Sequence, residues 1–331
     1  MTLAEAHVTE RTSKMRTDSM TELAIIVLNY RTPDLSLACI ESLQSQLDTD
    51  TRVIVVDNAS ADGSAERIEH GIRERGLSAE LLRSPVNGGF AAGMNFGIRA
   101  VPASAYLLLN SDTIVQPNAL ASLRTAMQRF PRAGIIGPAL IDEHGEIAPS
   151  AFRDPHPVSE LLRSARTRPL QRALERFDLV LPKSTRPFQP DWLAFACVLV
   201  RRELIERIGL LDEGYFMYFE DVDYCRRARE AGFKILYWPE AQVAHFAGSS
   251  SGVTAQTEQQ RRAPRYYYEA RARYFAKFFG RKGLWLANGL WHLGRSVSWS
   301  RERLGRRAPH LREREARDIW INAFAPLEGS S

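Results

Sequence analysis

The chain has 331 residues, of which 44% are hydrophobic and 25% are charged. These proportions are those of an ordinary globular protein, so they exclude a largely disordered chain and allow one large domain with or without appended elements. A chain of this length buries most of its apolar surface without a disulfide, and its three widely spaced cysteines favour a reducing, cytosolic compartment.

The net charge of +5 is distributed unevenly along the sequence. Residues 261–282 contain eight basic side chains and one acidic side chain, so this segment carries +7 and the rest of the chain −2. We therefore treat residues 261–331 as a separate basic, aromatic and helical region.

Neither a signal peptide nor a membrane-spanning helix is predicted. Residues 1–21 mix charged and small polar side chains without an apolar stretch, which predicts a disordered leader. No run of eighteen apolar, uncharged residues occurs in the sequence.

From residue 22 onward, strand patterns alternate with helix patterns. Four strands are predicted from apolar runs, at residues 23–30, 52–57, 79–84 and 106–112. Each is followed by a predicted helix, at residues 32–47, from residue 62, at 88–100 and from about residue 117. Four such units predict an α/β protein with a Rossmann-like parallel sheet.

Polar side chains follow three of these strands, at the edge where such sheets bind ligands. They are Asn29, Tyr30, Asp57, Asn58, Asn110, Ser111 and Asp112. The carboxylate of Asp57 can accept hydrogen bonds from a base or a ribose. The alternative is that Asp57 and Asp62 only stabilise turns and the next helix.

Gly88 and Gly89 begin a helix of small residues. Such a start lets the backbone approach a diphosphate at the helix N-terminus, but tight packing of the helix on the sheet explains it equally well. The pattern is neither GxGxxG nor a P-loop, which argues against an NAD-dependent dehydrogenase.

The second half of the chain holds further candidate residues. Prolines recur through residues 149–190, which predicts an excursion of short helices rather than an independent domain. Glu220 and Asp221 begin a helix, where a carboxylate is either a general base or a complement to the helix dipole. We expect Asp221 to be ionised there without a raised pKa. His245 follows a predicted strand and becomes a candidate ligand if Asp112 binds a metal nearby.

Six ordered segments together resemble the inverting family 2 glycosyltransferases, and within them bacterial rhamnosyltransferases of surface-polysaccharide and cell-wall assembly. The segments are IIVLNYRTPDL, VVDNASADGS, NGGFAAGMNFGI, LLLNSDT, FMYFEDVDYCRRAREAGFKI and HFAGSSSG, and the resemblance extends over residues 23–273. It implies a GT-A fold, a mixed and mostly parallel sheet flanked by helices, with a C-terminal helical extension. The catalytic domain would span residues 22–260, with a nucleotide-sugar half at 22–140 and an acceptor half at 141–260.

The resemblance also implies roles for individual residues. Donor binding is expected from Asn29, Tyr30, Asp57, Asn58, Asn87, Gly88, Gly89, Asn95 and Asn110. Asp112 and His245 match metal-ligand positions for Mg²⁺ or Mn²⁺, and Asn110 stands where the family motif begins with a carboxylate. Asp221 matches the catalytic base, with Glu220 beside it. Trp192 and Phe195 lie on the acceptor side, and many relatives have glycine at the position of Phe195.

The implied reaction is the transfer of L-rhamnose from dTDP-rhamnose, with inversion, to a glycan or a polyprenyl-diphosphate-linked acceptor. Two alternatives remain: a UDP-sugar-dependent glucosyl- or galactosyltransferase of the same fold, and a non-catalytic subunit of carbohydrate assembly. A nucleotidyltransferase is disfavoured because no glycine-rich loop follows the first strand.

The basic aromatic C-terminal region predicts helices that lie on an anionic membrane surface. This would place the protein in the cytoplasm, peripherally on the inner face of the bacterial cytoplasmic membrane. The alternative is that these helices pack on the catalytic domain. Nucleic acid is not expected as a partner because no recognition motif accompanies the basic residues.

Overall fold

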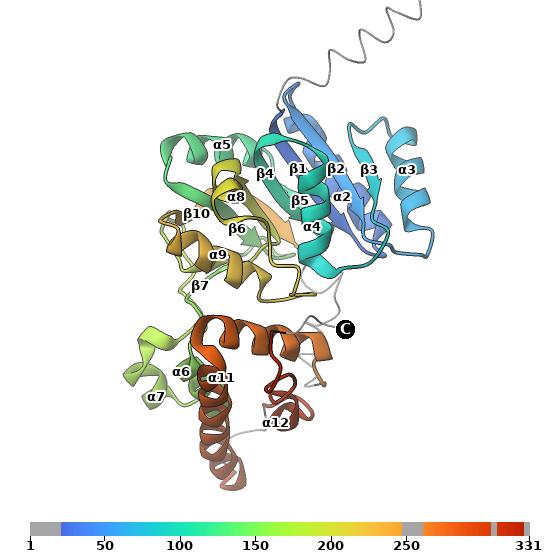
Figure 1. Ribbon diagram of the computed structural model, residues 1–331. Coiled ribbons are helices and arrows are strands. Elements are labelled where there is room, and N and C mark those ends of the chain that lie inside the picture. The colour runs from blue at the N-terminus through green and yellow to red at the C-terminus, as the bar shows by residue number, and fades with distance from the viewer. Residues whose placement is uncertain (1–20, 247–260, 306–309, 328–331) are drawn as a thin grey trace, which may run out of the picture.

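A computed structural model describes residues 21–246, 261–305 and 310–327. Figure 1 shows a sheet flanked by helices above a smaller helical part, which combines C-terminal residues with a segment from the middle of the chain. The predicted leader, residues 1–21, lies outside the described residues except for Thr21, which begins the first strand.

One eight-stranded sheet forms the centre of the upper part. Its strands are β1 (Thr21–Asn29), β2 (Thr51–Asp57), β3 (Glu80–Arg83), β4 (Ala103–Asn110), β5 (Thr113–Val115), β6 (Ala133–Ile141), β9 (Cys197–Arg201) and β10 (Lys234–His245). They are ordered β3-β2-β1-β4-β9-β6-β10-β5. The first four are parallel, and β9 runs antiparallel to both β4 and β6. The predicted α/β class with a mixed, mostly parallel sheet is confirmed.

Helices cover both faces of the sheet, as the continuous apolar runs of the central strands require. They are α2 (Pro33–Leu43), α3 (Ser64–Glu74), α4 (Gly89–Ala100), α5 (Ala119–Arg129), α8 (Arg202–Ile208) and α9 (Glu220–Glu230). Buried side chains of α2, α3 and α5 share one core with Ile25 and Val27 of β1. Those of α4, α8 and α9 share the other core with Ala24 and Ile26, so alternate residues of one strand serve two cores.

Strand β4 ends two residues earlier than predicted. The N–H of Asn110 donates to the carbonyl of Ala196 at 2.9 Å, and the hydroxyl of Thr113 then donates to the carbonyl of Asn110 at 2.7 Å. The chain therefore turns at Ser111 and Asp112 into the short strand β5, which pairs with β10. This turn leaves Asp112 beyond the strand end, at the edge of the sheet.

The helical part joins two distant segments of the chain. It contains α6 (Pro157–Ala165), α7 (Arg168–Ala173), α11 (Arg265–Arg303) and α12 (Glu315–Asp318), and a small sheet of β7 (Ala151–Phe152) and β8 (Trp192–Leu193) lies beside it. Helix α6 packs along α11. Helix α11 kinks at Gly280, where φ is +69° and ψ is 173°, and in Figure 1 its first half lies beneath the sheet while its second half points away.

Candidate active site

A cavity of about 500 Å³ opens at the carboxyl ends of the parallel strands. Ten of the fifteen residues predicted as site residues line it, and their roles in binding or catalysis stay predictions. They are Tyr30, Asn58, Asn87, Gly89, Asn110, Asp112, Phe195, Glu220, Asp221 and His245.

Asp112 and His245 come together at one side of the cavity. Strands β5 and β10 pair with His245 opposite Thr113, which brings the neighbouring Asp112 beside the imidazole. Asp112 Oδ1 lies 3.4 Å from His245 Nε2, and the Asp112 side chain is only 1% exposed.

This pair fits a divalent cation. Two metal bonds of about 2.1 Å that meet at a right angle place their ligand atoms about 3 Å apart, near the observed separation. Within the described ranges, no group of three or more His, Cys, Asp or Glu side chains is arranged to hold a metal. An ion held by Asp112 and His245 would therefore need further ligands from outside these two side chains.

Glu220 and Asp221 begin helix α9 at another side of the cavity. Burial raises the pKa of Asp221 to about 6, although backbone N–H groups of Val222 and Phe195 donate hydrogen bonds that oppose the rise. The expectation of no raised pKa was therefore wrong, because burial of a helix start depends on contacts that the local sequence does not contain.

Burial also raises the pKa of Glu220 well above its ordinary value, and the nearby charges of Asp221 and Asp223 add to this effect. Glu220 therefore holds its proton more tightly than an exposed carboxyl group does. Its Oε2 atom is buried without a hydrogen-bond partner in the part of the chain that the structure describes. Asp221 Oδ1, by contrast, accepts a hydrogen bond from the N–H of Val222 at 2.8 Å, which favours its ionised form.

The turn that leads into α9 has an uncommon backbone conformation. Tyr218 and Phe219 have φ angles of +73° and +66°, in the left-handed region that L-residues rarely adopt. Each such residue costs about 1–3 kcal/mol and persists only where surrounding contacts hold it. The strain lies directly before Glu220 and Asp221.

Five predicted site residues do not line the cavity: Asn29, Asp57, Gly88, Asn95 and Trp192. Asp57 Oδ1 accepts hydrogen bonds from Asn29 Nδ2 at 2.7 Å and from the Ser60 hydroxyl at 2.6 Å. Asn29 Oδ1 in turn accepts from the Ser36 hydroxyl at 2.9 Å. In this structure Asn29 and Asp57 therefore hold the loops that follow β1 and β2.

Asn95 and Trp192 also make internal contacts. The side chain of Asn95 exchanges two hydrogen bonds with the backbone of Leu211, at 2.9 and 3.1 Å. Trp192 Nε1 donates to the carbonyl of Arg153 at 2.9 Å, and its ring stacks on Phe152. Both side chains therefore stabilise segments that lie near the cavity, but they do not form part of the cavity wall.

Gly89 has a packing role that the sequence left open. Its φ is +83°, and a Cβ atom there would lie 1.9 Å from the carbonyl oxygen of Phe216. That oxygen accepts a hydrogen bond from the N–H of Phe90 at 2.8 Å, and the N–H of Gly89 donates to Asn87 Oδ1 at 3.0 Å. The first N–H groups of α4 are thus already used within the protein.

The cavity wall also contains residues that the sequence did not single out as site residues. They are Leu28, Phe90, Ser111, Ala194, Ala196, Phe216, Met217, Tyr218 and Tyr266. Tyr266 belongs to the C-terminal helix, and its ring lies near those of Phe216 and Tyr218. No local motif marks Tyr266, because only the packing of α11 beneath the sheet brings it to the cavity.

The family model described as "Glycosyltransferase like family 2" matches residues 21–266. The chain therefore belongs to this family and is a glycosyltransferase. The matched range contains all fifteen predicted site residues and ends at Tyr266 in the cavity wall.

Relatives and solved structures agree with this assignment. The N-acetylglucosaminyl-diphospho-decaprenol L-rhamnosyltransferase of Mycobacterium tuberculosis is 28% identical over 246 residues, which cover 70% of this chain and 78% of the relative. A low-salt glycan biosynthesis hexosyltransferase of Haloferax volcanii is 26% identical over 231 residues, covering 68% of this chain and 67% of the relative.

Among solved structures, the mannosyltransferase of Pyrobaculum calidifontis in complex with GDP-Man and Mn²⁺ has a TM-score of 0.54 and 14% identity. The match covers 97% of this chain and 92% of the mannosyltransferase. At this identity the likeness concerns the fold alone, and it confirms the GT-A architecture expected from the sequence.

Within residues 21–246, 261–305 and 310–327, no helix is both long and apolar enough to cross a bilayer.

Proposed function

We propose that this glycosyltransferase transfers a sugar from a nucleoside diphosphate donor to an acceptor hydroxyl, with inversion and with a divalent cation. One observation carries the proposal: Asp221, whose pKa is raised by burial, lines the same cavity as the Asp112–His245 pair. The cavity thus holds a base and a site for a cation.

In the proposed reaction, Asp221 accepts the proton of the acceptor hydroxyl while the hydroxyl oxygen attacks the anomeric carbon of the donor sugar. The bond between that carbon and the diphosphate oxygen breaks, and the nucleoside diphosphate leaves with the electron pair. Asp112 and His245 would hold a divalent cation, which would supply neutralisation of the diphosphate charge. One displacement from the opposite face inverts the configuration and needs no enzyme nucleophile.

Two buried polar atoms at the cavity are suited to substrate contacts. Asn58 Oδ1 and Glu220 Oε2 have no hydrogen-bond partner among the residues that the structure describes. A buried polar atom without a partner costs free energy, which a ligand recovers on binding. In the proposed complex, Asn58 Oδ1 would accept a hydrogen bond from the substrate, and the carboxyl group of Glu220 would form one with a sugar hydroxyl.

For the donor we propose dTDP-rhamnose, and for the acceptor a sugar linked to a polyprenyl diphosphate. The support is the relative from Mycobacterium tuberculosis, whose name specifies both an L-rhamnosyl group and a diphospho-decaprenol acceptor. A UDP-sugar donor is the second candidate.

The test is transfer by the purified full chain to N-acetylglucosaminyl diphosphate polyprenol, in detergent and with Mn²⁺. The donors are dTDP-rhamnose, UDP-glucose, UDP-galactose and GDP-mannose, and mass spectrometry detects the lipid product. We expect a rhamnosylated lipid from wild type and none from Asp221→Asn. Transfer of a different sugar would show that dTDP-rhamnose is not the donor. Equal transfer by wild type and by Asp221→Asn would overturn the role of Asp221 as the base.

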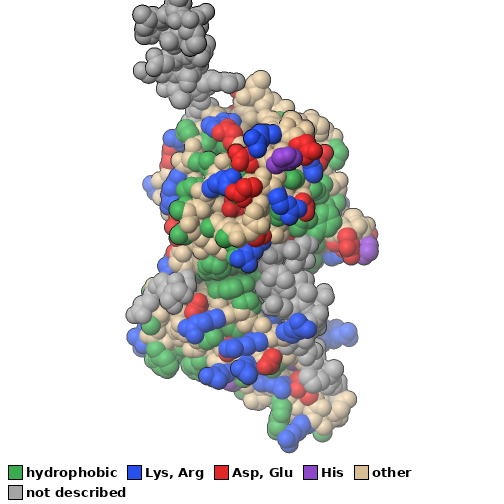
Figure 2. All heavy atoms as spheres, turned by 90° about the vertical axis from the view of Figure 1, so that its right-hand side faces the viewer, with side chains coloured by type: hydrophobic (Ala, Val, Ile, Leu, Met, Phe, Trp, Pro, Cys, Tyr) green, Lys and Arg blue, Asp and Glu red, His purple; other side chains and the backbone are tan. Residues whose placement is uncertain are grey.

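We also propose that the second half of α11 contacts an anionic membrane surface. Leu286, Leu293 and Val297 are spaced seven and four residues apart, so they lie along one helix face, and Leu304 follows directly after the helix. All four side chains are 38–67% exposed. Figure 2 shows Lys and Arg side chains spread over this lower, helical part of the molecule. Exposed apolar side chains beside cations suit the surface of a lipid bilayer.

The aromatic residues of the C-terminal region, which the sequence analysis assigned as a whole to a membrane surface, divide into two groups. Tyr268, Phe275 and Trp291 are buried within the protein, so the packing alternative holds for them. Trp285 and Trp299 remain exposed.

The membrane proposal is tested by flotation with vesicles of phosphatidylglycerol and of phosphatidylcholine. We expect wild type to float with the anionic vesicles, and Leu293→Glu with Val297→Glu to remain in the soluble fraction. Val86→Glu with Val180→Glu, which places the same two charges on exposed valines outside α11, is the control. Equal flotation of all three proteins would contradict the proposal.

A further inference from the structure

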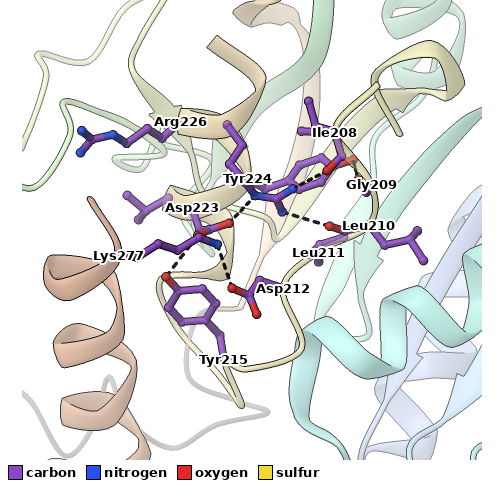
Figure 3. A network of polar contacts seen from close by, with 12 residues as sticks. Ile208, Gly209, Leu210, Leu211, Asp212, Tyr215, Asp223, Tyr224, Arg226 and Lys277 are labelled. Carbon is purple, nitrogen blue, oxygen red and sulfur yellow. Dashed lines mark hydrogen bonds and ion pairs between the residues drawn. The ribbon is translucent and has the colours of Figure 1, made fainter. Parts of the chain in front are cut away.

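Lys277 of the C-terminal helix α11 joins two carboxylates of the catalytic domain. Its Nζ lies 2.6 Å from Asp223 Oδ2 and 2.8 Å from Asp212 Oδ2. Figure 3 shows Lys277 reaching from α11 between Asp223 on α9 and Asp212 on the preceding loop. This contact connects residues 261–331 with the element that carries Asp221.

Asp223 is fully buried, so its carboxylate oxygens are surrounded by protein groups. Besides Lys277, Arg227 Nε donates to it at 2.6 Å and the hydroxyl of Tyr215 at 3.2 Å. Arg227 also donates to the carbonyls of Ile208, the last residue of α8, and of Leu210 in the following loop. Removing one partner of a buried charge is costly, because the remaining charge has lost its solvation.

Asp212 is held by the same helix. Burial alone would raise its pKa, but hydrogen bonds from Lys277 and Arg273 lower the pKa of Asp212 to about 2. Arg273 Nη2 lies 2.9 Å from Asp212 Oδ1, and Gly214 leaves the room for its guanidinium group. Two cations of α11 therefore fix the loop that leads to the strained turn.

Aromatic side chains of α11 also pack on that turn. Phe219 lies 5.5 Å from Tyr274 and 6.0 Å from Tyr267 between ring centroids, and Tyr218 stacks on Tyr266 at 6.2 Å. The left-handed conformation of Tyr218 and Phe219 requires such support from outside the turn.

The outer side of α9 makes a third contact with α11. The guanidinium of Arg226 lies 4.3 Å from the ring centroid of Phe278, and its Nη1 donates to the hydroxyl of Tyr274 at 3.2 Å. Val222, the residue after Asp221, is buried in a cluster with Tyr274 and Phe275. Ionic, aromatic and apolar contacts thus converge on the first turn of α9.

We propose that α11 is part of the catalytic apparatus, with Lys277 as a positioning residue for Asp221. Lys277 does not line the cavity; it acts through Asp223, two residues after the base, and through the loop at Asp212. The inference rests on the proposed role of Asp221 as the base. A displacement of about 1 Å in a catalytic group can lower the rate about 100-fold.

The test compares Lys277→Met, Lys277→Arg and the control Lys282→Met in the full chain. Lys282 is exposed on the same helix, so its replacement removes the same charge without the contacts. We expect Lys277→Met to lower kcat about 10- to 100-fold at unchanged donor KM, Lys277→Arg to recover much of the loss, and Lys282→Met to match wild type.

Amide hydrogen exchange over residues 215–224 supplies a readout that does not depend on activity. We expect faster exchange there in Lys277→Met and not in Lys282→Met. Lys277→Gln, which keeps a hydrogen-bond donor, replaces the Met variant if that protein does not fold. If a folded Lys277 variant shows unchanged kcat and unchanged amide exchange, the positioning role is overturned. If the wild-type protein is inactive but the variant shows altered exchange, only the proposed reaction is overturned.

Discussion

Glu220 and Asp221 are adjacent, and burial raises the pKa of both carboxyl groups. The charge of Asp221 raises the pKa of Glu220 further. Backbone N–H groups of Val222 and Phe195 donate to Asp221 and limit the rise of its pKa. On this basis we propose Asp221 as the base and a hydrogen-bonding role for Glu220.

Isosteric amides separate these roles. Asp221→Asn removes the proton acceptor, and we expect kcat to fall about 10²- to 10⁴-fold while the donor still binds. Glu220→Gln imitates the neutral acid, and we expect it to retain most of the activity. Steady-state kinetics of both variants checks this, and a larger loss in Glu220→Gln than in Asp221→Asn would reverse the assignment.

The pH profile of kcat/KM reports the same group. A base works only when deprotonated, so activity is present above its pKa and is lost as the pH falls through it. With the pKa of Asp221 at about 6, we expect kcat/KM to decline below about pH 6 with a slope of one in the logarithm. An acid limb that sets in well below this pH would show that Asp221 titrates as an ordinary surface carboxylate or is not the base.

At the scale of elements, the sequence predicted local units well and contacts between distant units poorly. The four βα units follow from apolar periodicity, and the polar residues after β1, β2 and β4 follow from the rule that parallel strands end at one edge. The contact between Gly89 and Phe216 could not be predicted, because 127 positions separate the two residues and only the folded chain brings them together. Asn29 and Asp57 show the same limit, since their pairing with each other appears only in the structure.

The close contact at Gly89 predicts a specific substitution effect. Gly89→Ala combines a left-handed backbone with a Cβ clash against a carbonyl oxygen, so we expect the free energy of unfolding to fall by about 3 kcal/mol or more. Gly76→Ala has positive φ but open space, and we expect a loss of only about 1 kcal/mol. Urea unfolding compares the variants, and equal losses would contradict the packing role of Gly89.

At the scale of the whole molecule, the C-terminal region and the catalytic domain share a buried cluster. Tyr215 and Val222 from the catalytic domain lie in it with Tyr274, Phe275 and Leu284 from α11. In the sequence, residues 261–331 differ from the rest of the chain in charge and aromatic content. These properties do not reveal which side chains of α11 pack against the catalytic domain.

Because of this shared cluster, we expect the full chain to unfold in one cooperative transition. Calorimetry measures the number of transitions, and removal of residues after 260 should leave a poorly soluble protein with exposed apolar surface. Two separate transitions, or a stable and active truncated protein, would contradict the shared core.

The most direct test of the proposed reaction is donor binding measured by saturation-transfer NMR, with and without Mn²⁺, on wild type and on Asp112→Asn. We predict that wild type binds dTDP-rhamnose in a Mn²⁺-dependent way and that Asp112→Asn loses this dependence. Failure of the folded wild-type protein to bind any nucleotide sugar, or equal binding with and without the metal, would contradict the account.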